Sequence, residues 1–473
     1  MYDPEYNNQN DQDVNDLVNN FEAMLRSKRS SYFIDETAFE QILDYYESKD
    51  KTNQAMEVAN MAITQYPFSA TFIVRKAQLL FDNKEFDTAL EILDKAEVLD
   101  PMDINIFLLR SDIYVWQGKY NKGVKVIKEA ISRTDVSEHS DLYLELADIY
   151  EEWEKYGKVF ESLKMALEVS NDNEEALSRI WFCVEFTEDY NESVIFHKAY
   201  IDENPYSHLG WFNLAHAYSG LKDYDRAIEA FEFVFAIDET YDYAYKDCAE
   251  LLVKIGQYQK AADYFMEALK HTAKPYKELY YSLGQCYEKM NNYNKARYHF
   301  RKATNIDPFF EEAFYKIGNN YQKENRFESA IASYERAYKL NDKSSDYSSA
   351  LALVYRETGD LDRSIKMYQS TVELNPKVKQ YWLDLSKTMF DAGDFRGALD
   401  ALDRAIPLFD DCADILYTKS AYYYQIGNRN ESFVNLERAM IQDSKKYELI
   451  FAITPYMEND PVINTIIEQY LCK

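Results

Sequence analysis

Large apolar residues recur along this chain at a nearly constant interval, and this period dominates its hydrophobic pattern. One series of aromatic residues and a single leucine shows it: Phe86, Tyr120, Tyr156, Tyr190, Tyr224, Tyr258, Tyr293, Phe327, Leu361 and Phe395. Successive members lie 34, 36, 34, 34, 34, 35, 34, 34 and 34 residues apart. A fixed period of this length indicates an array of structural repeats, each of which packs on its neighbours in the chain.

Small residues keep the same period and predict that each repeat is a pair of helices. Alanines follow many members of the series after three residues and again after ten, so that they share one helical face. Glycines fall between the two predicted helices of several repeats, where a left-handed residue ends the first helix (Gly118, Gly256, Gly359, Gly393 and Gly427). Prolines close several repeats (Pro67, Pro101, Pro205, Pro308 and Pro376).

The stretch between Pro275 and Pro308 carries a nearly complete set of these signatures: Tyr280, Leu283, Gly284, Tyr287, Ala296, Phe300, Ala303 and Pro308. In this spacing the chain resembles the tetratricopeptide repeat, a helix–turn–helix unit of 34 residues. The following repeat has the same pattern with Phe314, Ile317, Gly318, Tyr321, Ala330, Tyr334 and Ala337. The resemblance implies an all-α fold, a right-handed superhelical solenoid of such repeats.

The period divides the chain into three parts. Residues 34–445 hold twelve repeats, with first helices that open near Glu36, Ala70, Ile104, Ser140, Glu174, His208, Asp242, Lys277, Glu311, Ser345, Lys379 and Ala413. Residues 1–33 form an acidic extension, in which the apolar residues between Val14 and Leu25 predict an amphipathic helix. This helix either caps the first repeat or docks into a groove of the same molecule or of a second copy. Residues 446–473 predict two capping helices, over Tyr447–Met457 and Val462–Leu471.

The charge of the chain narrows the classes of partner. With 82 acidic and 53 basic residues the formal net charge is −29, which disfavours binding to nucleic acid or to anionic membranes and favours basic partners. No run of 18 apolar residues occurs, so we expect no membrane insertion. The beginning of the chain lacks the features of a signal peptide, and its five cysteines are scattered, so we expect reduced thiols and a cytoplasmic location.

The sequence offers little chemistry for catalysis. The six histidines are dispersed, none has a second histidine or a cysteine at metal-ligand spacing, and no phosphate-binding or nucleophile motif is present. We therefore expect no enzyme activity, no cofactor and no metal.

Function is expected on the concave surface that, by the resemblance, the first helices line. In the family their second, fifth, ninth, twelfth and thirteenth positions point into this groove. The groove residues expected to bind a partner are Asp44, Glu47, Asp112, Trp116, Asp148, Glu151, Phe182, Phe186, Phe212, His216, Tyr243, Tyr281, Tyr315 and Asn319. The family's clamp for carboxyl-terminal tails is not expected, because Lys246 is followed by Glu250 and Asn319 is preceded by Tyr315 at the positions concerned.

Three hypotheses follow from these patterns. The first is an interaction scaffold that holds a protein or peptide with basic and apolar residues in the groove, where aromatic rings give affinity and carboxylates give orientation. The second is a structural protein that assembles with its own copies through the terminal helices. The third and weakest is an enzyme or small-ligand binder that uses the region of His216 and Phe212.

Overall fold

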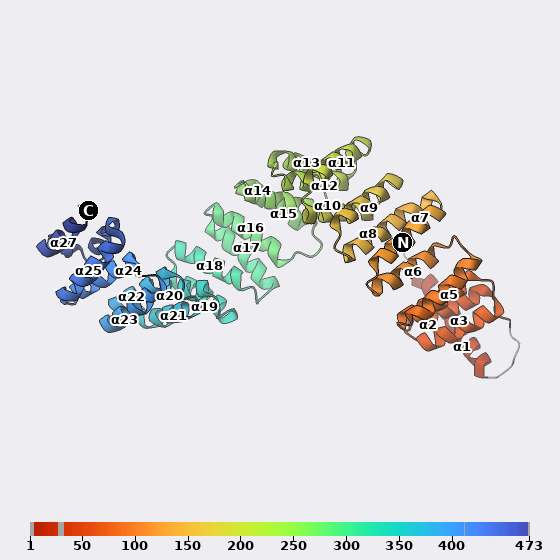
Figure 1. Cartoon of the computed structure of the whole chain (residues 1–473), viewed down its shortest axis with the longest axis horizontal. Helices are drawn as coiled ribbons and strands as arrows, with labels where there is room; N and C mark the ends of the chain where they lie inside the picture. The colour runs from red at the N-terminus through yellow and green to blue at the C-terminus, as the bar shows by residue number, and fades with distance from the viewer. Residues whose placement is uncertain (1–3, 27–32, 411, 472–473) are drawn as a thin grey trace. The chain divides into compact units, whose positions relative to one another are not determined.

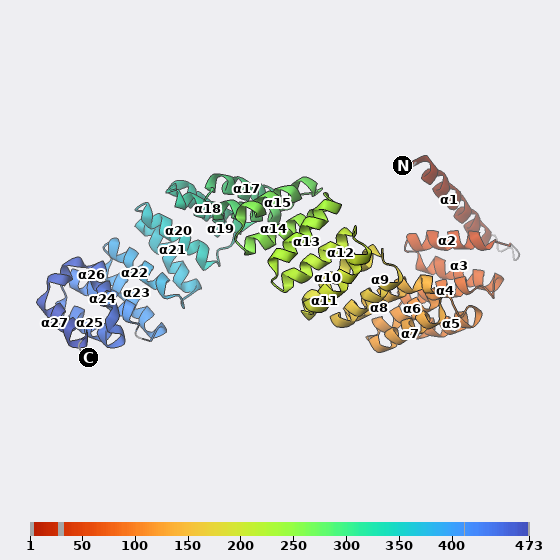
Figure 2. The ribbon, with the colours of Figure 1, turned by 90° about the horizontal axis from the view of Figure 1, so that it is seen from above.

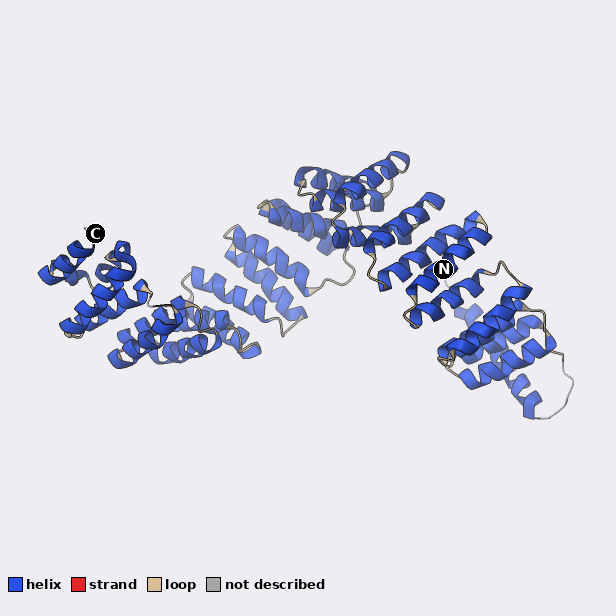
Figure 3. Ribbon diagram, viewed as in Figure 1, coloured by secondary structure: helices blue, strands red, loops and turns tan. Residues whose placement is uncertain are grey.

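The computed structural model describes residues 4–26, 33–410 and 412–471, and the residues it describes form helices and turns without any strand (Figure 3). In these residues twenty-seven α-helices follow one another, and from α2 to α25 the two helices of each successive pair pack side by side (Figure 1). The predicted all-α repeat solenoid is thereby confirmed. No helix of the described part is both long and apolar enough to cross a bilayer.

The chain divides into two compact units, and unit 1 comprises residues 1–239. It begins with α1 (Pro4–Arg26) and continues as six helix pairs. The first helices of these pairs are α2 (Glu36–Ser48), α4 (Ala70–Asp82), α6 (Ile104–Trp116), α8 (His139–Glu152), α10 (Glu174–Thr187) and α12 (His208–Gly220). The second helices are α3 (Thr52–Gln65), α5 (Phe86–Leu99), α7 (Tyr120–Arg133), α9 (Tyr156–Val169), α11 (Tyr190–Glu203) and α13 (Tyr224–Ile237). A short 3-10 helix, η1 (Val136–Glu138), precedes α8.

Unit 2 comprises residues 240–473 and continues the same pattern with six more pairs. Its first helices are α14 (Asp242–Lys254), α16 (Lys277–Lys289), α18 (Glu311–Lys323), α20 (Ser345–Glu357), α22 (Lys379–Asp391) and α24 (Ala413–Gln425). Its second helices are α15 (Tyr258–His271), α17 (Tyr293–Ile306), α19 (Phe327–Leu340), α21 (Leu361–Leu374), α23 (Phe395–Ala405) and α25 (Arg429–Asp443). The remaining elements are η2 (Ile406–Leu408), η3 (Ser444–Lys446), α26 (Glu448–Ile453), η4 (Pro455–Asn459) and α27 (Pro461–Leu471).

The helices begin where the sequence period places them. Eleven of the twelve first helices start at the predicted residue, and α8 starts one residue earlier, at His139. Every member of the aromatic and leucine series is the first residue of a second helix. The prediction of one helix over Tyr447–Met457 is wrong, because Pro455 cannot continue α26, and the chain instead forms the 3-10 helix η4.

A left-handed residue ends the first helix of each pair. The predicted glycines have positive φ, as at Gly118 with φ 70°. In the other seven pairs the same position holds a residue with a side chain and φ between 52° and 63°: Asp50, Lys84, Glu154, Glu188, Lys222, Asn291 and Asn325. The turn conformation is therefore common to all twelve pairs, although glycine occupies it in five.

Small residues bring the two helices of a pair close together. A Cβ atom added to Gly318 in α18 would lie 2.6 Å from ring atoms of Tyr334 in α19, and Gly284 has the same relation to Phe300 in the preceding pair. Both rings are completely buried. The spacing of Gly, aromatic and Ala residues thus reflects close helix packing.

The two ends of the array are covered by additional helices. At the N-terminal end, α1 lies next to α2 (Figure 2). Val18 and Phe21 of α1 are buried in one cluster with Phe39 and Ile42 of α2, and the Tyr46 hydroxyl donates a hydrogen bond to Glu22 at 3.2 Å. At the other end, α26 and α27 contribute apolar residues to a cluster with α24 and α25. The predicted boundary at residue 33 adjoins residues 27–32, which lie outside the described part, and the division at 34 and 446 stays a prediction.

Candidate functional site

The two units differ sharply in charge. Residues 1–239 contain 48 acidic and 22 basic residues, whereas residues 240–473 contain 34 acidic and 31 basic residues. Nearly all of the net negative charge therefore belongs to unit 1, at −26 against −3. The electrostatic field of the chain is therefore negative around unit 1, whereas unit 2 is close to neutral.

The acidic residues expected in the groove are partly neutralised by an arginine from the next repeat. Arg75 in α4 binds Asp44 of α2 at 2.6 Å and Glu47 of α2 at 2.7 Å. The arginine follows these carboxylates by 31 and 28 residues. Burial alone would lower the pKa of the Arg75 guanidinium, but its hydrogen bonds to both carboxylates raise that pKa. Asp44 and Glu47 therefore form an internal ion-pair network.

The same arrangement recurs between α8 and α10. Arg179 bonds to Asp148 and, at 2.8 Å, to Glu151, again 31 and 28 residues before it. In unit 2, Lys316 of α18 binds Glu288 of α16 at 3.2 Å, also with a separation of 28 residues. In three junctions, then, a cation at one fixed position of a first helix neutralises acidic residues of the preceding first helix.

At the junction between α6 and α8 this position holds an acid instead. Glu145 lies five residues before Tyr150, as Arg179 lies five residues before Val184. It follows Asp112 by 33 residues because the repeat from Tyr120 to Tyr156 is two residues longer than most. Asp112 and Glu145 have no ion pair among the residues that the structure describes.

Burial and the neighbouring carboxylates perturb this acidic pair. Burial, followed by the charges of Asp112, Asp148 and Glu152, raises the pKa of Glu145 from its ordinary 4.5 to about 7. Burial first, then Glu152 and Asp148, also raises the pKa of Asp112. Like charges in a partly dehydrated site disfavour ionisation, so a cation at this junction would be strongly attracted.

The junction opens into a cavity of about 750 Å³ between α6, α8 and α10. One cation, Arg179 of α10, and six acids line it: Asp112, Glu145, Asp148, Glu151, Glu152 and Glu175. Arg179 is paired with Asp148, Glu151 and Glu175. We call this space the carboxylate cavity. The volume admits an arginine or lysine side chain together with part of its backbone.

Exposed aromatic rings in α10 border the same side of unit 1. Phe182 and Phe186 are 43% and 54% exposed and contact each other edge to face, and Phe186 stacks on Tyr156 with ring centroids 4.2 Å apart. Trp181 of the same helix contacts Phe182 edge to face, and His216 of α12 stacks on Trp181 with ring centroids 4.7 Å apart. Phe182 and Phe186 thus offer apolar surface on α10, the helix that also supplies Arg179.

The other aromatic residues expected in the groove differ in their exposure. Trp116 and Tyr243 are exposed, at 63% and 64%. Tyr281 and Tyr315 are half-buried. Each packs on an aromatic ring in the second helix of its own pair and on another ring at the beginning of the next pair. Phe212 is buried against Phe231, Trp181 and His216.

The polar residue Asn319 is half-buried and accepts a hydrogen bond from the Tyr334 hydroxyl at 2.6 Å. The structure thus gathers Asp112, Asp148 and Glu151 around the carboxylate cavity, and elsewhere in unit 1 it pairs both Asp44 and Glu47 with Arg75. Tyr243, Tyr281, Tyr315 and Asn319 lie in unit 2. Their role in binding stays a prediction.

Sequence reasoning missed Glu145, Arg75 and Arg179, which were not counted as groove positions. Arg75 and Arg179 are the sixth residues of α4 and α10, and Glu145 is the seventh residue of α8, which begins one residue earlier than predicted. The repeat register contains the signal, because the separations of 31 and 28 residues pair an acid with a cation twice in unit 1. Counted with the two-residue insertion, this position holds an acid at Glu145 in unit 1 and at Asp247 and Asp384 in unit 2.

Three segments of the chain match family models described as tetratricopeptide repeat, over residues 210–241, 278–310 and 315–379. Among curated proteins, the chain is similar to anaphase-promoting complex subunit 3 of Schizosaccharomyces pombe. The two are 28% identical over 167 residues, which cover 35% of this chain and 24% of that protein. It is also similar to protein IFIT1 homolog B of Homo sapiens, with 25% identity over 233 residues, 48% of this chain and 45% of that protein. The chain thus spans less than half the length of the curated relatives it matches.

Among solved structures, the chain is similar to YrrB, described as a TPR protein with an unusual peptide-binding site. The identity is 19% and the TM-score 0.34, over 38% of this chain and 92% of YrrB. The C-terminal part of a TPR repeat-containing protein from Cytophaga hutchinsonii matches with 17% identity and a TM-score of 0.45, over 50% of this chain and 98% of that one.

Proposed function

Because the chain is a tetratricopeptide-repeat protein, we propose that it is an interaction scaffold that binds a segment of another protein and catalyses no reaction. The carboxylate cavity takes an arginine or lysine of that segment. The observation that carries this proposal is Glu145, which stands where two other junctions of unit 1 have Arg75 and Arg179.

The partner's cation would complete a pattern that the chain itself uses. In the junctions of Arg75 and Arg179, one guanidinium binds two carboxylates of the preceding repeat. A guanidinium between Asp112 and Glu145 would make the same charge-assisted hydrogen bonds and remove the repulsion between the two acids. Hydrogen bonds to charged groups contribute roughly 1.5–3 kcal/mol each, so a single well-placed arginine gives much of the affinity of a short segment.

Apolar residues of the same segment would contact the exposed rings of Phe182 and Phe186 on α10. A large ring or aliphatic chain packed there removes apolar surface from water and contributes affinity, while the carboxylates select the charge and the direction of the segment. The similarity to anaphase-promoting complex subunit 3, by its name a component of a protein assembly, supports a scaffold role.

The test replaces Glu145 by arginine, so that the chain itself supplies a cation in the carboxylate cavity. Full-length wild-type and variant chains serve as baits in affinity capture from a lysate of the source cells, followed by quantitative mass spectrometry. Glu168→Arg is the matched control, because Glu168 is an exposed residue of the second helix α9 and the charge change is the same. We expect proteins with basic segments that the wild-type and Glu168→Arg chains retain and that Glu145→Arg loses.

Measured with a synthetic peptide from a captured protein, Glu145→Arg should weaken binding about ten-fold or more, since it replaces attraction with repulsion. Changing the peptide's arginine to glutamine should weaken binding to the wild-type chain by a similar factor and have little effect on the variant. If Glu145→Arg and Glu168→Arg retain the same partners with equal affinity, the carboxylate cavity is not the binding site.

A further inference from the structure

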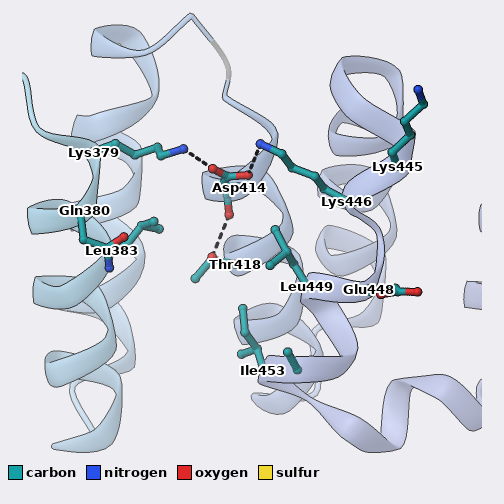
Figure 4. A pocket seen from close by; sticks show the side chains of 11 residues that line it. Lys379, Gln380, Leu383, Asp414, Thr418, Lys445, Lys446, Glu448, Leu449 and Ile453 are labelled. Carbon is teal, nitrogen blue, oxygen red and sulfur yellow. Dashed lines mark hydrogen bonds and ion pairs between the residues drawn. The ribbon is translucent and has the colours of Figure 1, made fainter.

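A second cavity lies within unit 2, where the last helix pair meets the C-terminal helices. It has a volume of about 690 Å³, with α22 and α24 on one side and η3 and α26 on the other (Figure 4). Its distinguishing feature is an ion bridge across the opening between these elements, formed by Lys379, Asp414 and Lys446.

Three lysines (Lys379, Lys445 and Lys446) and two carboxylates (Asp414 and Glu448) line the cavity. Asp414 at the start of α24 binds the ammonium groups of Lys379 and of Lys446, the latter at 2.9 Å. Burial alone would raise the pKa of Asp414, but these hydrogen bonds lower it, and the same bonds raise the pKa of both lysines. The Lys446 ammonium also lies 3.8 Å from a carboxylate oxygen of Asp443, which does not line the cavity. Each ammonium group has three N–H donors, so the two lysines can donate to a further carboxylate in the cavity.

Apolar side chains line the space next to this bridge. Figure 4 shows Leu383 of α22 facing Leu449 of α26 across the space, with Ile453 one turn further along α26. Leu449 is 37% exposed although it belongs to the C-terminal cap, so it contributes apolar surface that the chain itself leaves partly uncovered. The cavity therefore joins a cationic edge to an apolar wall.

We propose that this cavity binds a segment of a partner protein in which an aspartate or glutamate adjoins a large apolar residue. The carboxylate binds Lys379 and Lys446, and the apolar side chain packs on Leu383 and Leu449. Unit 2 has nearly balanced charge, with 34 acidic and 31 basic residues, and therefore does not repel such a segment as unit 1 would. This site is independent of the carboxylate cavity and selects the opposite charge.

The role of Asp414 distinguishes binding from a merely structural function of the bridge. Asp414 occupies the lysine donors that a bound carboxylate would use, so it competes with the ligand. Asp414→Asn removes this competitor and should strengthen binding, whereas Lys446→Gln removes a donor and should weaken it. A bridge that only held the cap in place would respond to both changes in the same direction.

The probe is a displayed library of random 12-residue peptides selected on the full-length chain. Peptides that also bind a chain with both Lys446→Gln and Leu449→Ala are depleted before each round. We expect the surviving peptides to carry Asp or Glu next to Leu, Ile, Met or Phe. The best peptide is then synthesised with a fluorophore, and its dissociation constant is measured by anisotropy.

For that peptide we expect roughly five- to ten-fold weaker binding to Lys446→Gln and to Leu449→Ala, and roughly three-fold or tighter binding to Asp414→Asn. Lys366→Gln in α21 should leave the affinity unchanged, because this exposed lysine lies outside the cavity. Leu449→Ala shortens a partly exposed side chain and changes no charge. It therefore still tests the cavity if Lys446→Gln or Asp414→Asn loosens the packing of the C-terminal helices.

Three results would overturn the proposal. One is that depletion leaves no peptide or leaves peptides without acidic residues, and another is that Asp414→Asn weakens binding. The third result combines two measurements. A synthetic peptide of residues 1–26, which has six acidic residues before its first basic one, displaces the selected peptide. In light scattering the wild-type chain dimerises and the Lys446→Gln chain does not. In that case the occupant is a second copy of the chain.

Discussion

Replacement of Glu145 by glutamine isolates the electrostatic cost of the carboxylate cavity. Glutamine keeps the shape of the side chain and removes its charge. In the folded chain, burial and the charges of Asp112, Asp148 and Glu152 raise the pKa of Glu145 to about 7, against its ordinary 4.5. Between these two values the folded chain holds a proton that the unfolded chain has released. Stability therefore falls as the pH rises through this window, and above pH 7 the whole cost is present.

The magnitude follows from the shift in pKa. At 1.36 kcal/mol for each pH unit, the difference between 4.5 and about 7 corresponds to at most roughly 3 kcal/mol. Glu145 is only partly buried, and water screens part of its interaction with neighbouring charges, so we expect about 1–2 kcal/mol. Glu145→Gln should be more stable than the wild type by this amount at pH 8 and equally stable at pH 4.

Urea denaturation of the two full-length chains, followed by circular dichroism at pH 4, 6 and 8 and constant ionic strength, measures this difference. Long repeat arrays do not always unfold in one step, so hydrogen exchange in α6 and α8 provides the local free energy. Glu168→Gln in α9 is the matched control and should match the wild type at every pH. An advantage of Glu145→Gln that is absent at pH 8, or equal at pH 4 and pH 8, would refute the reasoning.

Two further predictions concern packing. Gly318→Ala should destabilise unit 2 by about 1–3 kcal/mol in urea denaturation, because the added Cβ would overlap the Tyr334 ring. Gly157→Ala in α9 should instead stabilise unit 1 by about 0.5 kcal/mol, because its added Cβ meets nothing closer than 4.0 Å. Phe21→Ala removes a buried ring of α1, a loss of about 3 kcal/mol, and should release α1 without unfolding the array. In hydrogen exchange, the protection of residues 4–26 should then vanish while α4 to α27 remain protected. Asn20→Ala, at an exposed position of α1, is the control and should leave the protection unchanged. A loss of protection that spreads beyond α3 in Phe21→Ala would contradict the prediction.

The helix pairs were predictable from the sequence because each repeat meets the same packing requirement. An aromatic residue starts every second helix from α5 to α23 except α21, where Leu361 has this place, and small residues follow on the buried face. The C-terminal end was less predictable, since α26 packs on α24 and α27 on α25 outside the period of the helix pairs. Pro455 then decides the local structure, and the helix expected over Tyr447–Met457 ends at Ile453.

The exposure of groove residues was less predictable than the helices. Positions counted from the helix start indicate the side of the helix on which a residue lies, but not whether a neighbouring ring covers it. Phe212, at the fifth position of α12, is buried by Trp181 of the preceding first helix, while Phe182 and Phe186, at the ninth and thirteenth positions of α10, remain exposed. Contacts between first helices of successive repeats decide this difference, and a single repeat does not reveal them.

Both proposed sites lie where the chain departs from its own repeat pattern. Around Glu145 the departure is a connection between α7 and α8 that contains η1 and lengthens the repeat to 36 residues, together with an acid where the junctions of Arg75, Arg179 and Lys316 have a cation. Around Asp414 it is Lys446, which comes from η3 beyond the last pair and adds a second ammonium group to one carboxylate. In a repeat array, residues that satisfy the pattern stabilise the stack, and a position that breaks it leaves a charge or a cavity without an internal partner. Such positions are where a partner gains most from binding, and in this chain the two of them select opposite charges.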